Sequence, residues 1–167
     1  IIGYGKRDTN NDPETAGPST QFYTNLNASY NFEINPKNFI NINSQNFYLS
    51  SKNYISNELF RFGGMNSIRG FLENSLQCNF NFLILTEYRY KFSNNIYAHT
   101  IADYGIYQDL TSTIEPNKTK KLIGLGLGTV LQTPNGLLRI NLTNGGKNAQ
   151  ELQLYNTIVN ICYNVKF

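Results

Sequence analysis

Arg69 lies in the stretch of this sequence best suited to specific chemistry, residues 58–71. The stretch reads ELFRFGGMNSIRGF and follows neither the alternation of a strand nor the period of a helix. Gly63, Gly64 and Gly70 permit backbone angles that residues with a Cβ resist. We therefore expect a compact, bent loop that holds Arg69 in one place, where its planar guanidinium donors would suit a carboxylate.

The other residues able to do chemistry form no catalytic or metal-binding set. Cys78 and Cys162 are far apart and have neither CxxC spacing nor histidine partners, so we expect two free structural thiols and no metal. Gly124-x-Gly126 lacks the third glycine and the following helix of a nucleotide fingerprint. We interpret it as a strand face stripped of side chains, which leaves room for another segment to approach. We expect no cofactor and no enzymatic activity.

Composition excludes some classes of protein and leaves others open. The net charge of +3 is small and evenly spread, so no nucleic-acid partner is expected. No apolar run is long enough for a transmembrane helix, but a transmembrane β-barrel alternates apolar with polar residues and keeps mean hydropathy low. The first residues, Ile-Ile-Gly-Tyr-Gly, lack the basic and apolar regions of a secretion signal, so we expect a piece of a longer protein.

Alternation of apolar and polar residues predicts an all-β, antiparallel fold of about eight strands. In residues 22–34 the even positions are mostly apolar and the odd positions mostly polar, which indicates a long strand with one apolar and one wet face. Further strands are expected at 1–7, 38–50, 79–92, 96–107, 123–131, 138–143 and 157–167.

The connections between these strands alternate in length. Turns at 35–37, 93–95 and 133–136 are short, whereas connections at 8–20, 51–78, 108–120 and 144–156 are long. Short turns at one end and long loops at the other are typical of an outer-membrane β-barrel, with the short turns on the periplasmic side. A soluble β-sandwich also alternates, but its strands are usually shorter than these.

Several motifs resemble one known family. The loop at 51–78 carries a pattern that closely resembles the GG…(V/I)RG(F/Y) signature of the BamA/TamA-type outer-membrane superfamily, in Gly63, Gly64, Ile68, Arg69, Gly70 and Phe71. Downstream, 86–89 resembles the family's EYR segment, 102–105 its (F)xDxG segment with Ala102 departing from the pattern, and 123–140 its GxGxG…TPxGxxRI segment. Phe167 matches the aromatic C-terminus of outer-membrane barrels.

The resemblance implies that the loop folds back into the barrel and that Arg69 pairs with an acidic residue of the wall. The alternation separately turns Asp103 and Glu87 toward the lumen. We predict that Arg69 pairs with Asp103, with Glu87 as a second carboxylate within reach. The alternatives are that both acids only decorate a wet lumen, and that Arg69 is incidental to a glycine-rich surface loop.

The family barrel has sixteen strands, so the resemblance implies that residues 1–167 form the C-terminal half of one barrel domain, in the outer membrane of a Gram-negative bacterium. It implies insertion of outer-membrane proteins or translocation of polypeptides, and the sequence does not separate the two. The implied partners are outer-membrane lipid and unfolded outer-membrane or secreted polypeptides, and periplasmic accessory proteins stay open. Alternative functions are the barrel anchor of a patatin-like lipase fusion and a passive porin.

Overall fold

The computed structural model describes residues 1–9, 17–52, 54–111, 118–147 and 152–166, and its main feature is one antiparallel sheet of eight strands. The strands lie in the order β1-β2-β3-β6-β7-β8-β9-β10, so each pairs with its neighbours along the chain. They are β1 (Ile2–Thr9), β2 (Gly17–Asn35), β3 (Asn38–Ser51), β6 (Phe80–Lys91), β7 (Ile96–Gln108), β8 (Lys120–Thr133), β9 (Gly136–Gly146) and β10 (Ile158–Val165). The predicted all-β, antiparallel fold is confirmed.

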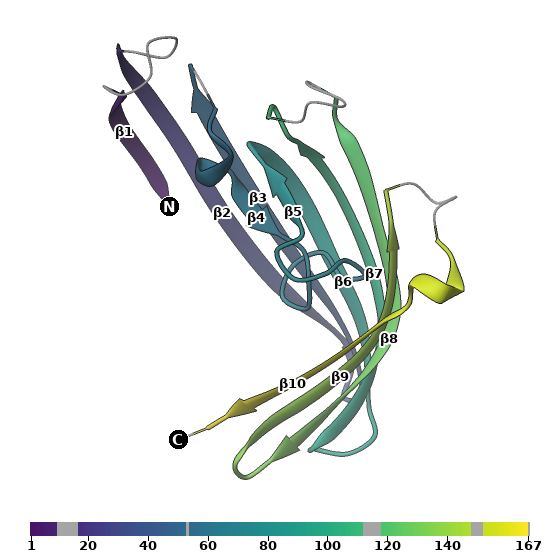
Figure 1. Ribbon diagram of the computed structural model, residues 1–167. Helices are drawn as coiled ribbons and strands as arrows, with labels where there is room; N and C mark the ends of the chain where they lie inside the picture. Colours follow the sequence, from purple (N-terminus) through teal and green to yellow (C-terminus); the bar gives the residue numbers. More distant parts are fainter. Residues whose placement is uncertain (10–16, 53, 112–117, 148–151, 167) are drawn as a thin grey trace.

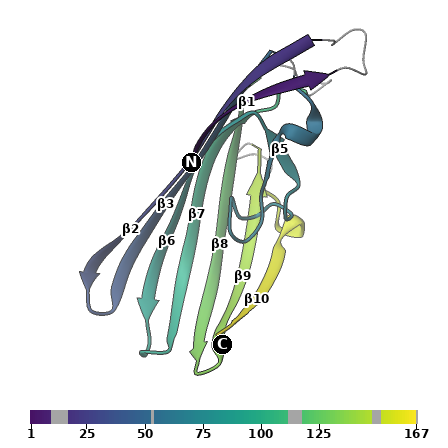
Figure 2. The same cartoon turned by 90° about the vertical axis from the view of Figure 1, so that its left-hand side faces the viewer.

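The sheet curves strongly but does not close on itself, and β1 and β10 are its edges (Figure 1). The tight turns β2–β3, β6–β7 and β8–β9 lie together at one end of the sheet, away from the connection between β3 and β6. That connection, which contains β4 (Phe60–Phe62) and β5 (Leu76–Cys78), folds onto the concave face (Figure 2). The sheet therefore wraps around its own longest described loop.

Some element bounds differ from those that the alternation predicts. β2 is 19 residues long and begins at Gly17, five residues before the predicted start, because the polar residues 17–21 pair with β1. The loop contains the β4–β5 hairpin, whose three-residue strands are too short to show a period.

Helical structure in the described ranges is limited to the short 3-10 turns η1 (Ser56–Glu58) and η3 (Leu154–Asn156), and none of it is long and apolar enough to span a membrane.

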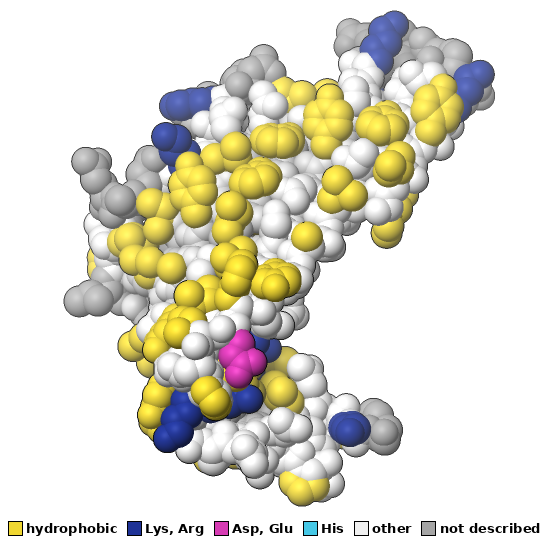
Figure 3. Space-filling model, turned by 180° about the vertical axis from the view of Figure 1, so that it is seen from behind, with side chains coloured by type: hydrophobic (Ala, Val, Ile, Leu, Met, Phe, Trp, Pro, Cys, Tyr) yellow, Lys and Arg dark blue, Asp and Glu magenta, His cyan; other side chains and the backbone are white. Residues whose placement is uncertain are grey.

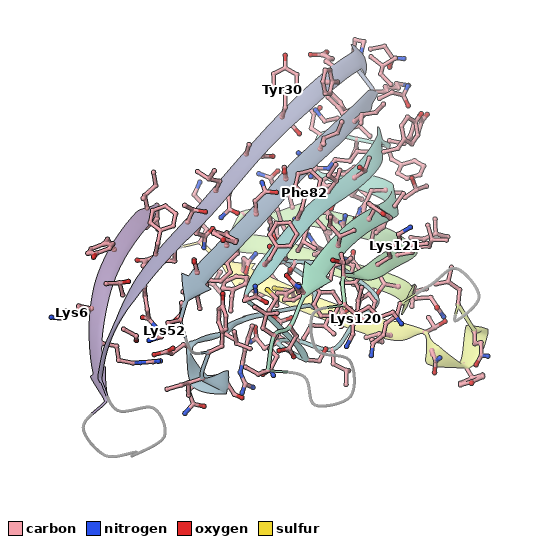
Figure 4. The ribbon with its side chains drawn as sticks, turned by 90° about the horizontal axis from the view of Figure 1, so that it is seen from above. Lys6, Tyr30, Lys52, Phe82, Lys120 and Lys121 are labelled. Carbon is pink, nitrogen blue, oxygen red and sulfur yellow. The ribbon has the colours of Figure 1, made fainter. Side chains whose placement is uncertain are left out.

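The two faces of the sheet differ in chemistry. The convex face carries a broad band of apolar side chains (Figure 3), among them Leu26, Tyr30 and Leu127, which are 56%, 62% and 61% exposed. Figure 4 shows Tyr30 on β2 toward the tight turns, whereas Phe82 on β6 lies toward the other end of the sheet, as do Lys120 and Lys121 at the start of β8 and Lys52 just after β3. A sheet with apolar side chains outward and polar ones inward is the pattern of a strand-built membrane wall.

The concave face also holds an apolar core, where the loop meets the strands. Phe62 and Ile68 from the loop pack with residues of three neighbouring strands, namely Leu83, Leu85, Tyr107 and Leu122. Leu83 and Leu85 interrupt the polar pattern expected for the inner face of β6, because the loop covers them. Burial of this core holds the loop against the wall through the hydrophobic effect.

Adjacent residues at the middle of β2 test the assignment of faces. Leu26→Arg places a charge on the outer face, where a charged side chain at the bilayer midplane lowers folding stability by about 2–4 kcal/mol. Asn27→Arg places the same charge in the polar interior, so its loss of stability should be much smaller. Denaturant titration of the full-length protein folded into lipid vesicles measures both. Equal losses of folding free energy would contradict the assignment.

Candidate functional site

Arg69 is buried at the centre of the concave face, between β6 and β7. Its Nε and Nη2 atoms donate to the two carboxylate oxygens of Asp103 at 2.7 and 2.5 Å, which is a bidentate pair. Its backbone N–H donates to the same carboxylate at 3.0 Å, and its Nη1 donates to Glu87. The side chains of Arg69, Glu87 and Asp103 are only 4%, 7% and 0% exposed. The structure thus brings together the three charged residues that the sequence singled out.

Glu87 is shared between two arginines. While one of its oxygens accepts from Arg69, the other accepts from Nε and Nη2 of Arg89 at 2.8 and 2.7 Å. Arg89 lies two residues further along the same strand, so both side chains face the lumen. The cluster therefore contains two arginines and two carboxylates, and its charges balance, as burial of charge requires.

Glycines allow the loop backbone to lie directly on the wall. A Cβ atom at Gly124 would lie 2.2 Å from the carbonyl oxygen of Arg69. Gly70 has φ +87°, and a Cβ there would lie 2.4 Å from the backbone of Asn144. The interpretation of Gly124 as a bare strand face that another segment approaches agrees with this geometry, and the approaching segment is the arginine loop.

The turn before Arg69 is built by its own glycines. Gly63 and Gly64 have φ of +106° and +103°, angles that other residues rarely adopt. The Gly64 carbonyl accepts from the Ser67 amide, and the Gly64 amide donates to the Ile68 carbonyl. This turn points Ile68 into the apolar core, where it is fully buried, and delivers the next residue, Arg69, to the carboxylates.

The other residues that the sequence analysis named are the aromatic residue after the loop motif, the two cysteines and the C-terminal phenylalanine. Phe71 is partly buried and packs against the apolar core under the loop. Cys78 is buried and Cys162 half-buried, and both are free. Burial raises the pKa of the Cys78 thiol well above its ordinary value, so this group stays protonated and unreactive. Phe167 lies outside the described residues.

The sequence reasoning missed a second polar anchor of the loop. Nη1 of Arg7, on β1, donates to the Glu58 carboxylate at 2.6 Å, and Nε2 of Gln21, on β2, donates to the same oxygen at 2.8 Å. No short spacing links these three residues, so only the folded sheet brings them together. The alternation places Arg89 on the same inner face as Glu87, but it does not predict that the two residues pair.

The described residues contain no group of three or more His, Cys, Asp or Glu side chains that could hold a metal ion. The contacts described above are hydrogen bonds and ion pairs. These can fix the loop rigidly in the lumen, with the guanidinium as the central contact.

A family model described as the Omp85 superfamily domain matches residues 8–159, a span that includes the arginine loop and both carboxylates. No curated protein matches the chain.

Cys78 offers a direct test of how the loop is held. Arg69→Ala leaves the buried Asp103 carboxylate without its arginine and Glu87 with Arg89 alone, a loss on the order of 3–5 kcal/mol for a buried pair. The loop should therefore detach, and Cys78 should become reactive. Maleimide labelling of Cys78 in the folded full-length protein, read by peptide mass spectrometry, measures this. Arg61→Ala, at an exposed arginine of the same loop, is the matched control and should leave labelling low.

The same readout tests whether the two charges act as one unit. Asp103→Ala should raise labelling nearly as much as Arg69→Ala, and the double variant should add little, because partners in contact are not additive. If the increases in Cys78 labelling of the two single variants simply added in the double variant, the pairing would be contradicted.

Gly124 provides a test that removes no charge. Gly124→Ala forces a methyl group toward the Arg69 carbonyl, and such overpacking typically costs about 1–3 kcal/mol, so Cys78 labelling should rise while the strands remain formed. Gly5→Ala is the control, because a Cβ there meets nothing within 4 Å. Similar labelling of the two variants would show that the loop does not depend on this close approach.

Proposed function

Because the chain belongs to the Omp85 superfamily, we propose that it forms part of an outer-membrane β-barrel that inserts outer-membrane proteins or moves polypeptides across the membrane. The matched residues, 8–159, cover most of the chain and confirm the resemblance drawn from the loop motif. The proposed role is non-enzymatic, in a Gram-negative outer membrane, and its proposed substrates are unfolded polypeptides.

One observation carries this proposal beyond family membership: the loop is fixed inside the curved sheet by a buried, charge-balanced cluster. Burying charged groups costs free energy unless each is paired in good geometry. A passive porin needs no such brace, whereas a barrel that must hold a lumenal element while it handles a substrate does. The cluster therefore favours a transport or assembly barrel over the porin alternative.

The open sheet supports a larger barrel. β1 and β10 are its edges, and a strand edge in lipid would leave backbone hydrogen-bonding groups unpaired. We propose that further strands of the parent protein complete a barrel of sixteen strands, of which residues 1–167 supply the C-terminal half. An eight-stranded barrel would fill its interior with its own side chains and leave no space for the loop.

Reconstitution of the full-length protein tests the function. Proteoliposomes containing it should speed the insertion of an unfolded outer-membrane barrel substrate, read as protease-protected folded product, or admit an unfolded exported polypeptide, read as protection inside the vesicle. Which of the two products forms decides between insertion and translocation.

The Arg69→Ala variant should lose most of this activity. A loss of about 3–5 kcal/mol in loop docking would shift the docked population by about a hundredfold or more. Lys121→Ala, which removes an exposed charge of β8 away from the loop, should retain full activity. Ion conduction without any handling of polypeptide would instead support the porin, and unchanged activity of Arg69→Ala would overturn the role of the brace.

A further inference from the structure

The base of the arginine loop is tied to β1 and β2 through Glu58, but beyond it the loop is held unequally on its two sides. Toward β6 and β7 it is tied by the buried cluster of Arg69, Glu87 and Asp103. Toward β2 and β3, the described part of the chain shows a single hydrogen bond to the loop tip (residues 65–67), from Nε2 of Gln45 to the carbonyl of Asn66 at 2.9 Å. Among the described residues, the tip is therefore tied to β2 and β3 far more weakly than Arg69 is tied to β6 and β7.

Two cavities lie between the loop and the β2–β3 wall, one on each side of the tip. The first has a volume of about 250 Å³ and is lined by Asn25, Asn27 and Gln45 from the wall. The second has a volume of about 340 Å³ and is lined by Asn31, Asn41 and Asn43. Asn66 of the tip lines both, so the tip alone divides one continuous strip of wall.

The lining of this strip is a ladder of carboxamides, which we name the amide strip: Asn25, Asn27, Asn31, Asn41, Asn43 and Gln45. None of these six side chains carries a charge, although Arg69, Glu87, Arg89 and Arg139 also line the second cavity, and Arg61 and Glu73 also line the first. Each carboxamide offers both a donor and an acceptor, as a peptide group does. Oδ1 of Asn43 is buried and has no hydrogen-bond partner among the described residues, and neither has Oγ of Ser67 across the tip.

We propose that the amide strip binds an extended segment of an unfolded polypeptide through its backbone, with the loop tip as a movable cover. This inference rests on the proposed function and adds the surface that the substrate follows. The occupant is a polypeptide, because carboxamides match the peptide N–H and C=O groups that every segment carries whatever its side chains.

The spacing of the strip suits such an occupant. Asn27 faces Gln45 and Asn31 faces Asn41 in the strand register, and residues on one face of a strand repeat every two positions. An extended polypeptide repeats its backbone groups at the same interval, roughly 6–7 Å. A segment lying along β2 and β3 therefore meets a carboxamide at each repeat whatever its sequence.

Photo-cross-linking tests the position of the substrate. Benzoylphenylalanine at Asn27, in the full-length protein during the activity assay above, should capture the unfolded substrate. The same group at Leu26 tests the outer face of β2, and at Asn160 it tests a different strand, β10. Capture from Asn27 together with little from Leu26 and Asn160 is the expected result.

Substitution tests the chemistry. Asn27→Leu keeps the size of the side chain but removes its hydrogen-bonding groups, and each hydrogen bond lost should slow substrate handling about fivefold. Ala28→Leu adds the same side chain on the outer face of β2 and should leave the rate unchanged.

The outcomes separate this inference from the proposed function. If the wild-type protein handles no polypeptide, the proposed function fails first. If it is active but cross-links equally from Asn27 and Asn160, or captures only lipid from Asn27, the amide strip is not the substrate surface. Normal rates for Asn27→Leu in an active protein would likewise overturn the inference.

Discussion

The structure depends on the burial of one guanidinium between two carboxylates. Arg69 cannot lie inside a curved sheet unless its charge is paired and its donors are used, because an unpaired buried charge costs several kcal/mol. Asp103 takes two side-chain donors and the backbone amide of the same arginine, and Glu87 takes a third side-chain donor. These hydrogen bonds therefore fix the positions of β6, β7 and the loop relative to one another.

The same demand explains the bare glycine face of β8. Apolar residues could often replace a buried ion pair without loss of stability, so stability alone does not account for the cluster. A bidentate pair does fix orientation, since planar donors and acceptors match in few arrangements. Gly124 then lets the Arg69 backbone touch the wall, and Gly70 turns the chain away from it. The cluster defines position, while the apolar core around Ile68 supplies much of the adhesion.

Most of the sheet could be predicted from alternation, because period two is strong wherever one face meets lipid and the other a polar interior. The charged cluster could also be anticipated, since Glu87 and Asp103 fall on the inner face of strands that flank the loop. Leu83 and Leu85 could not be placed, because only the loop packed above them makes an apolar inner face favourable. The contact of Arg7 with Glu58 likewise depends on tertiary packing, 51 residues apart in the chain.

The loop tip is attached to the wall less firmly than Arg69 is, and this difference bears on which part of the loop could move. A brace that held every side of the lumen would leave no route past it, and one held nowhere would not keep its place. Here the Arg69–Asp103 pair is buried, whereas among the described residues the tip is hydrogen-bonded to the carboxamide wall through Gln45 alone. Exposed hydrogen bonds open at little cost and buried ion pairs do not. The weakest described contact of the loop tip therefore lies on the wall whose side chains most resemble a peptide backbone.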